Sequence, residues 1–149
     1  MVLNELLTKQ NLFTKILLKD GEKELPKELK VKVMRIRNAY NKMKKNIDSE
    51  IQEFVEEIMT DEFKELNQKS ERTSEEEIRY NELSNTINSE YQEYMNQKGK
   101  EEITFIEDTF TEDEYADILD VNSGNDVEIN GNKIPAVDFL EAIYELFVK

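Results

Sequence analysis

The chain has 149 residues, a net charge of −14, and neither cysteine nor histidine. Disulfides, thiolate nucleophiles, Cys/His zinc sites and histidine general bases are therefore excluded. Hydrophobic residues make up 38% of the chain and charged residues 36%, a balance that is typical of amphipathic helices rather than of a thick α/β core.

The first twenty residues do not have the pattern of a secretory signal. Acidic side chains, Glu5 and Asp20, stand among their apolar positions, so we expect no signal peptide. No stretch of the sequence reaches the roughly eighteen apolar residues that a membrane span needs. We therefore expect a soluble protein that is neither secreted nor inserted in a membrane.

Residues 3–18 are expected to form the first helix, and Gly21 is expected to stop it because glycine adopts positive φ readily. Pro26 then stands where helix starts tolerate proline. From there a long helix is predicted over residues 27–68, because apolar residues recur at steps of three and four. These residues are Leu29, Val33, Ile36, Tyr40, Met43, Ile47, Ile51, Phe54 and Ile58.

A continuous helix over 27–68 would be roughly 60 Å long, which exceeds the width of a compact domain of this size. Three arrangements remain open. Part of the helix projects, or it bends near residues 59–61, or it packs against a partner, which includes a homo-oligomer formed through this helix.

Charge is segregated along this helix. Residues 27–45 hold eight Lys/Arg and one acid, whereas residues 48–66 hold eight acids and one base. This order opposes the helix dipole at both ends, so something other than helix propensity favours it. Either the charged faces contact oppositely charged parts of the same fold, or one half of the helix docks onto a partner.

Ser70–Thr73 is expected to be a turn, after which Ser74 and Glu77 would form the capping box of a further helix that ends at Gly99. The short connection favours an antiparallel helical hairpin in which Leu83 and Ile87 pack on the long helix. The apolar side of this helix comprises Tyr80, Leu83, Ile87, Tyr91, Tyr94 and Met95. We expect the tyrosines to lie at the edge of a core with their hydroxyl groups in water.

The sequence changes in character after Gly99. Residues 103–106 are β-branched or aromatic and predict a short strand. Thr111 and Glu114 predict the capping box of a brief helix with Tyr115, Ile118 and Leu119 facing inward. Asn130-Gly131 predicts a hairpin turn between residues 127–129 and 133–134, because both turn residues must adopt positive φ. Pro135 then starts a last helix, whose expected inward residues are Val137, Phe139, Leu140, Ile143, Tyr144, Leu146 and Phe147.

The predicted fold is mainly α with a small β hairpin, and the long central helix belongs to an antiparallel helical hairpin. We expect a helical body over residues 1–99 and a compact acidic α+β lobe over residues 100–149. The two parts are expected to pack together as one cooperative unit.

Residues 101–128 hold eleven carboxylates and no base. Such a cluster costs stability through self-repulsion, so we consider two explanations: it solubilises the chain, or it binds a partner with a basic surface. The candidate partner-binding residues, called the lobe carboxylates below, are Glu107, Asp108, Glu112, Asp113, Glu114 and Asp117.

We expect no catalytic, cofactor-binding or metal-binding residues. Paired carboxylates do acid–base work only in a cleft that separates their pKa values, and the sequence does not indicate one. Asp126, Glu128 and Asn130 with Gly131 resemble the start of a calcium loop, but Val137 stands where such a loop needs glutamate. The basic half of the long helix lacks interleaved aromatic residues, so direct nucleic-acid binding is disfavoured.

Several short motifs in this order resemble a group of small uncharacterised proteins of tailed bacteriophages that infect low-GC hosts. The motifs are Lys23-Glu24-Leu25-Pro26 with Glu28, Arg79-Tyr80-Asn81-Glu82-Leu83, Ile103–Phe105, Asn130-Gly131, and Ile134-Pro135-Ala136. The group carries no established activity. The resemblance therefore implies a phage context, in the host cytoplasm or the virion, and no role for a particular residue.

We accordingly expect a non-enzymatic, protein-binding component of a bacteriophage, a virion structural or assembly protein. One alternative is an inhibitor of a host nuclease or other defence protein that mimics DNA with its acidic face. A second alternative, a small enzyme, is disfavoured by the lack of histidine, cysteine and glycine-rich phosphate loops.

Overall fold

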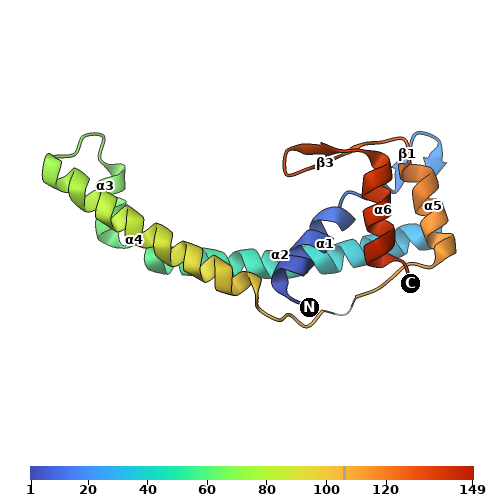
Figure 1. The fold of residues 1–149 in the computed structure, drawn as a ribbon, viewed down its shortest axis with the longest axis horizontal. Coiled ribbons are helices and arrows are strands. Elements are labelled where there is room, and N and C mark those ends of the chain that lie inside the picture. The colour runs from blue at the N-terminus through green and yellow to red at the C-terminus, as the bar shows by residue number, and fades with distance from the viewer. Residues whose placement is uncertain (106) are drawn as a thin grey trace.

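The computed structural model describes residues 1–105 and 107–149. In these residues it contains six helices and two small antiparallel β hairpins, so the prediction of a mainly α protein with a small β hairpin is confirmed (Figure 1). The helices are α1 (Leu3–Phe13), α2 (Lys27–Ile58), α3 (Asp61–Gln68), α4 (Ser74–Gly99), α5 (Glu112–Asn122) and α6 (Ala136–Phe147). The strands are β1 (Lys19–Asp20), β2 (Lys23–Glu24), β3 (Val127–Ile129) and β4 (Asn132–Ile134).

The molecule is elongated and has two parts (Figure 1). The head contains α1, α5, α6, the two β hairpins and residues 27–47 of α2. The helical hairpin, residues 48–97, contains the rest of α2, then α3 and most of α4, and it projects from the head. Of the arrangements considered for the long central helix, the structure therefore combines projection with a break near residue 59.

The core lies in the head and is centred on Phe13. This ring is fully buried and has three aromatic neighbours, Tyr40 at 5.6 Å, Phe110 at 5.8 Å and Phe147 at 5.3 Å between ring centroids. One hydrophobic cluster thus joins the N-terminal segment, α2 and the C-terminal helices. The prediction that Phe139, Leu140, Ile143 and Phe147 of the last helix are buried is confirmed.

The first helix ends at Phe13 and not near Leu18, as the sequence predicted. Asn122, a buried side chain on α5, forms two hydrogen bonds with the backbone of Leu17. Its Oδ1 accepts from the Leu17 N–H at 2.8 Å, and its Nδ2 donates to the Leu17 carbonyl at 3.2 Å. These contacts satisfy peptide groups that would otherwise need a helix. Gly21 does have positive φ, at 62°, but it forms the turn between β1 and β2 rather than a helix stop.

The long helix predicted over 27–68 is two helices. α2 ends at Ile58, and Thr60 starts α3 because its side-chain oxygen accepts a hydrogen bond from the Phe63 N–H at 3.2 Å. Asp61 and Glu62 occupy the first turn of α3, where the helix dipole favours acids. α3 then packs on α4, with Phe63 stacked on Tyr80 at 5.3 Å between ring centroids.

The N-terminal cap of α4 lies one residue earlier than predicted. Thr73 and Glu76 form the capping box. Glu77, the partner expected for Ser74, instead pairs with Arg72 at 2.7 Å. The antiparallel pairing of α4 with the second half of α2 is present (Figure 1). Lys98 forms an ion pair with Glu50 at the base of this hairpin.

Residues 103–105 form no strand, contrary to the prediction, and Ile106, the fourth residue of that prediction, lies outside the described residues. The chain is joined to the N-terminal segment here by an isolated antiparallel bridge, between Val2 and Glu102, rather than by a ladder. The Ile103 N–H donates to the Met1 carbonyl at 2.9 Å, and Phe105 stacks on Tyr40 at 4.7 Å between centroids. An extended chain becomes a strand only beside a partner with which it forms a ladder.

The predicted features of the last forty residues are largely confirmed. Thr111 and Glu114 form their capping box, and Asn130 (φ 51°) and Gly131 (φ 79°) form the turn between β3 and β4. Three residues expected to face inward do not: Leu119 is 42% exposed, Val137 69% and Tyr144 41%. The buried positions form a narrower stripe than we assumed, at steps of three and four residues along α5 and α6.

Candidate functional site

Three of the six lobe carboxylates form ion pairs within the head. Glu107 contacts Lys9 at 2.5 Å, Asp108 contacts Arg35 at 2.8 Å, and Glu114 contacts Lys32 at 2.9 Å. Burial alone would raise the pKa of Glu114. The backbone hydrogen bond at Thr111 and the Lys32 ammonium outweigh burial and hold the pKa of Glu114 below its usual range.

The other three lobe carboxylates are exposed in the first turns of α5. Glu112 accepts a hydrogen bond from the Tyr144 hydroxyl at 2.6 Å, which raises the pKa of Tyr144. Asp113 and Asp117 face the solvent. The structure thus engages four of the six residues in contacts within the chain.

The segregation of charge along α2 now has a structural explanation. Its basic half lies beside the acidic C-terminal segment, through pairs such as Lys32–Glu114 and Arg35–Asp108. Residues 1–47 hold twelve bases and five acids, and residues 98–149 hold fourteen acids and four bases, so these two parts of the chain largely neutralise each other. Contact between oppositely charged parts of one fold, the first of the two explanations considered for this helix, therefore accounts for the basic half.

The acidic half of α2 has no such counterpart. The helical hairpin, residues 48–97, holds fifteen acids and four bases, a net charge of −11 out of the −14 of the whole chain. Three of its bases pair with acids near its tip: Lys69 with Glu76, Arg72 with Glu77, and Arg79 with Glu62. The middle of the hairpin, residues 48–58 and 82–97, holds eight acids and no base.

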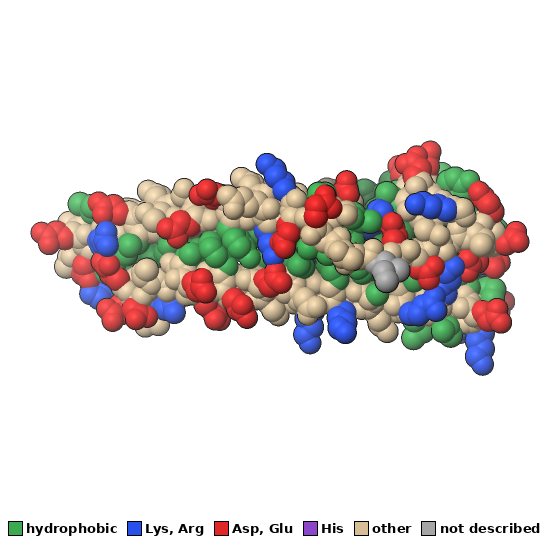
Figure 2. Space-filling view, turned by 90° about the horizontal axis from the view of Figure 1, so that it is seen from below, with side chains coloured by type: hydrophobic (Ala, Val, Ile, Leu, Met, Phe, Trp, Pro, Cys, Tyr) green, Lys and Arg blue, Asp and Glu red, His purple; other side chains and the backbone are tan. Residues whose placement is uncertain are grey.

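An apolar stripe runs along this hairpin between α2 and α4, with acidic side chains on either side of it (Figure 2). Phe54 and Tyr94 stack face to face, their ring centroids 3.9 Å apart and their planes at 8°. Most residues of the stripe are only half-buried, in contrast to the fully buried core of the head. The half-buried residues are Ile51, Phe54, Ile58, Leu83, Tyr91, Tyr94 and Met95.

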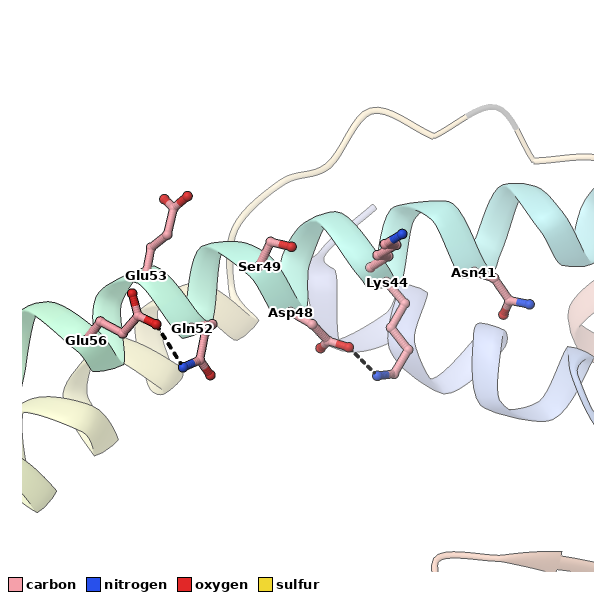
Figure 3. A pocket seen from close by; sticks show the side chains of 8 residues that line it. Asn41, Lys44, Asp48, Ser49, Gln52, Glu53 and Glu56 are labelled. Atoms are coloured by element: carbon pink, nitrogen blue, oxygen red, sulfur yellow. Dashed lines mark hydrogen bonds and ion pairs between the residues drawn. The ribbon is translucent and has the colours of Figure 1, made fainter.

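Two open hollows lie near the base of the hairpin. The larger, about 710 Å³, is bounded by α1, α2, α4 and the tip of the β3–β4 hairpin at Asn130. The second, about 650 Å³, is lined by α2 alone, and its side chains pair with each other, Lys44 with Asp48 at 2.7 Å and Gln52 with Glu56 at 3.3 Å (Figure 3). A hollow lined by one helix is open surface and lacks the convergent polar groups of a ligand site.

Two further features can be judged in the part of the chain that the structure describes. Residues 1–105 and 107–149 contain no cluster of three or more Asp or Glu side chains arranged to hold a metal ion. Asp126, which the calcium alternative required as a ligand, instead accepts a hydrogen bond from the Ala136 N–H at 3.1 Å and so helps to start α6. None of the helices in the same residues is long and apolar enough to cross a membrane.

Comparisons with protein-family models, curated proteins and solved structures find no match to this chain. The candidate site therefore rests on the charge and the geometry of the chain itself.

The sequence analysis named the lobe carboxylates as the candidate site and kept docking by one half of the long helix only as an alternative, without naming residues of the hairpin. A signal for the acids of the hairpin was available in the sequence. Counting charges by segment leaves residues 48–97 with an excess of acids that no nearby basic segment offsets. The exposed groove could not be found in this way, because the spacing of apolar residues does not tell whether one helix or several cover a stripe.

Proposed function

We propose that this chain is a non-enzymatic, protein-binding component of a bacteriophage, a virion structural or assembly protein, and that it docks onto its partner through the projecting helical hairpin. The observation that carries the proposal is the charge of the hairpin. The hairpin carries a net charge of −11, and its apolar residues are only half-buried. The charge attracts a basic partner, and the apolar residues retain it by direct contact.

The non-enzymatic part of the proposal is supported by the ion pairs that the acidic side chains form. Glu62 and Glu76 have lowered pKa values because Arg79 and Lys69, respectively, donate hydrogen bonds to them. Such pairing holds surface elements together, whereas a general acid needs a raised pKa in a cleft. The chain also has no histidine or cysteine.

The phage context rests on the sequence motifs described above. In the fold three of these motifs lie at element boundaries: Pro26 and Pro135 directly precede α2 and α6, and Asn130-Gly131 forms the β3–β4 turn. The residues of these motifs specify where helices and turns begin. Proteins that share them with this chain would therefore be expected to share its fold.

A test compares two charge variants of the full chain. The hairpin variant carries Glu53→Gln, Glu57→Gln, Glu90→Gln and Glu93→Gln, all at exposed positions. The lobe variant carries Glu112→Gln, Asp113→Asn and Asp117→Asn, which leave the ion pairs of the head intact. Tagged wild type and both variants are expressed in phage-infected cells, cross-linked and purified with their partners.

We expect the wild type and the lobe variant to retain the same phage head, tail or assembly protein, and the hairpin variant to lose it. Loss of the partner by the lobe variant alone would transfer the docking role to the lobe carboxylates, as the sequence first suggested. Full retention by both variants would contradict docking by either acidic surface.

A second candidate function is a DNA-mimicking inhibitor of a host nuclease or other defence protein. It is favoured by the spread of acids along the length of the hairpin, on both sides of the apolar stripe (Figure 2), because a rod of negative charge resembles a duplex to a nucleic-acid groove. The two candidates differ in competition. Duplex DNA should displace the chain from a nuclease and leave its complex with a virion protein intact.

A further inference from the structure

The apolar stripe between α2 and α4 of the helical hairpin is not covered by a third element, as it would be in a closed core. Its open side is called the groove below. A helix buries an apolar stripe by packing it against other elements, and in the middle of the hairpin α2 and α4 have mainly each other. Beside the stacked rings of Phe54 and Tyr94 lies a hollow of about 250 Å³, whose other lining residues are Glu90, Glu93 and Gln97.

Acidic side chains lie on both sides of this groove (Figure 2), and Glu90 and Glu93 line the hollow itself. Glu53 and Glu57 are exposed on α2, and Glu90 and Glu93 are exposed on α4. The bases of the hairpin do not offset them, because Lys69, Arg72 and Arg79 pair with acids near the tip. An apolar floor with acidic walls is complementary to a helix that carries one apolar face and basic flanks.

We propose that this groove binds a cationic amphipathic helix of a partner protein and thereby completes a three-helix bundle. The inference rests on the proposed function, since it specifies which kind of element the hairpin receives. Apolar residues of the guest helix at steps of three and four enter between α2 and α4 beside Phe54 and Tyr94. Its flanking Lys or Arg side chains reach the glutamates of the two walls.

The dimensions of the groove limit the guest. Beyond Tyr80, which packs on α3, the half-buried apolar positions of α4 extend from Leu83 to Met95, which corresponds to about 18 Å of helix axis. A guest helix of about twelve to sixteen residues spans this length. Helices this short are marginal alone in water, so the segment becomes fully helical when it binds.

Charge excludes two other occupants. A second copy of the same hairpin would bring together two surfaces of −11 each, which repel at low ionic strength. Nucleic acid would place phosphates against the glutamates of both walls. A basic helix is the occupant for which the apolar contacts and the charges act in the same direction.

The test uses three synthetic peptides of about sixteen residues and the isotope-labelled full chain. The first peptide has a Leu face and Lys flanks at helical spacing. The second has the same composition in a scrambled order, and the third keeps the Leu face but replaces Lys by Glu. Amide chemical shifts locate the binding site, and titration calorimetry gives the affinity at low and high salt.

The first peptide is expected to bind with shifts confined to residues 48–97, and to weaken about tenfold between about 50 and 300 mM salt. Equal binding of the scrambled peptide would overturn the proposal, because charge alone would then suffice. Equal binding of the acidic peptide, shifts centred on the head, or self-association of the chain through the groove would overturn it as well.

Protein variants separate the two contributions to binding. Phe54→Ala removes the apolar contact, and Glu90→Gln with Glu93→Gln removes charge at exposed positions, where folding is insensitive. Each is expected to weaken the first peptide about tenfold. Val31→Ala, at an apolar position of α2 in the head that is 57% exposed, is the matched control and should leave binding unchanged. Unchanged affinity in both groove variants would overturn the proposal.

Failure here and failure of the proposed function are distinguishable. If the natural partner needs the hairpin but no helical peptide binds, docking by the hairpin stands and the helical guest is wrong. If the peptide binds but the hairpin variant retains the natural partner as well as the wild type does, the proposed function falls.

Discussion

The ammonium group of Lys32, in the basic half of α2, lies 2.9 Å from the carboxylate of Glu114, at the start of α5. Glu114 also closes the capping box of α5, since it accepts from the Thr111 N–H at 3.0 Å. One side chain thus joins the basic half of the long helix to the acidic C-terminal lobe. The same contact reduces the availability of this acid for a partner.

Replacing Glu114 by Ala should therefore destabilise the fold. Loss of the cap and of a charge-assisted hydrogen bond predicts a decrease of about 1–3 kcal/mol in the free energy of unfolding. Asp113→Asn, in the same turn but exposed, is the control and should change stability by less than about 0.5 kcal/mol. Urea denaturation measures both, and an equal effect of the two substitutions would refute the role assigned to Glu114.

The buried face of α6 should dominate the stability of the head. Phe139 is 1% exposed, so Phe139→Ala leaves a cavity and should cost about 3–5 kcal/mol. Val137, two residues away, is 69% exposed, and Val137→Ala should cost less than about 0.5 kcal/mol. Chemical denaturation of the two variants gives the comparison. A small effect at Phe139 would mean that α6 is not part of the core.

The head and the helical hairpin should respond differently to loss of an aromatic ring. Phe13 is fully buried among three aromatic rings, and Phe13→Ala should cost about 3–5 kcal/mol. Phe54 is half-buried beside a groove, and Phe54→Ala should cost less than half as much, about 1–2 kcal/mol. Equal losses in denaturant melts would show that the groove is closed.

The cap of α4 predicts a dependence of stability on acid pH. Hydrogen bonds from Lys69 and from the Thr73 backbone lower the pKa of Glu76 to about 2. Its ionised form is therefore favoured by folding. This stabilisation is complete above the unfolded pKa of about 4.3 and is lost as the pH falls towards 2.

The corresponding experiment compares wild type with Glu76→Gln. The variant should be less stable than wild type at about pH 6 and nearly equal to it near pH 2, because the wild-type carboxylate is protonated there. Unfolding in urea at the two pH values supplies the numbers. A difference that does not change with pH would show that Glu76 gains nothing from its ionised form.

Local patterns in the sequence predicted those parts of the fold that local interactions determine. The Thr111–Glu114 capping box, the Asn130-Gly131 turn and the helix starts after Pro26 and Pro135 each depend on residues a few positions apart. Thr60 also carried a usable signal, since it precedes two acids and caps α3.

The errors came from contacts between residues far apart in the sequence. The first helix stops early because Asn122, more than a hundred positions later, holds the Leu17 backbone. The extended segment at 103–105 lacks a ladder partner, which no local pattern reveals. For the same reason the sequence could not show that Lys9, Lys32 and Arg35 would engage three of the lobe carboxylates.

The central claim is that the partner is bound by the projecting hairpin. Hydrogen–deuterium exchange of the full chain, with and without its purified natural partner, tests it most directly. We expect slower exchange in the partner complex over residues 48–58 and 82–97, and unchanged exchange over residues 112–122. Protection confined to α5, with the hairpin exchanging as in the free chain, would contradict the account and assign the interface to the lobe carboxylates.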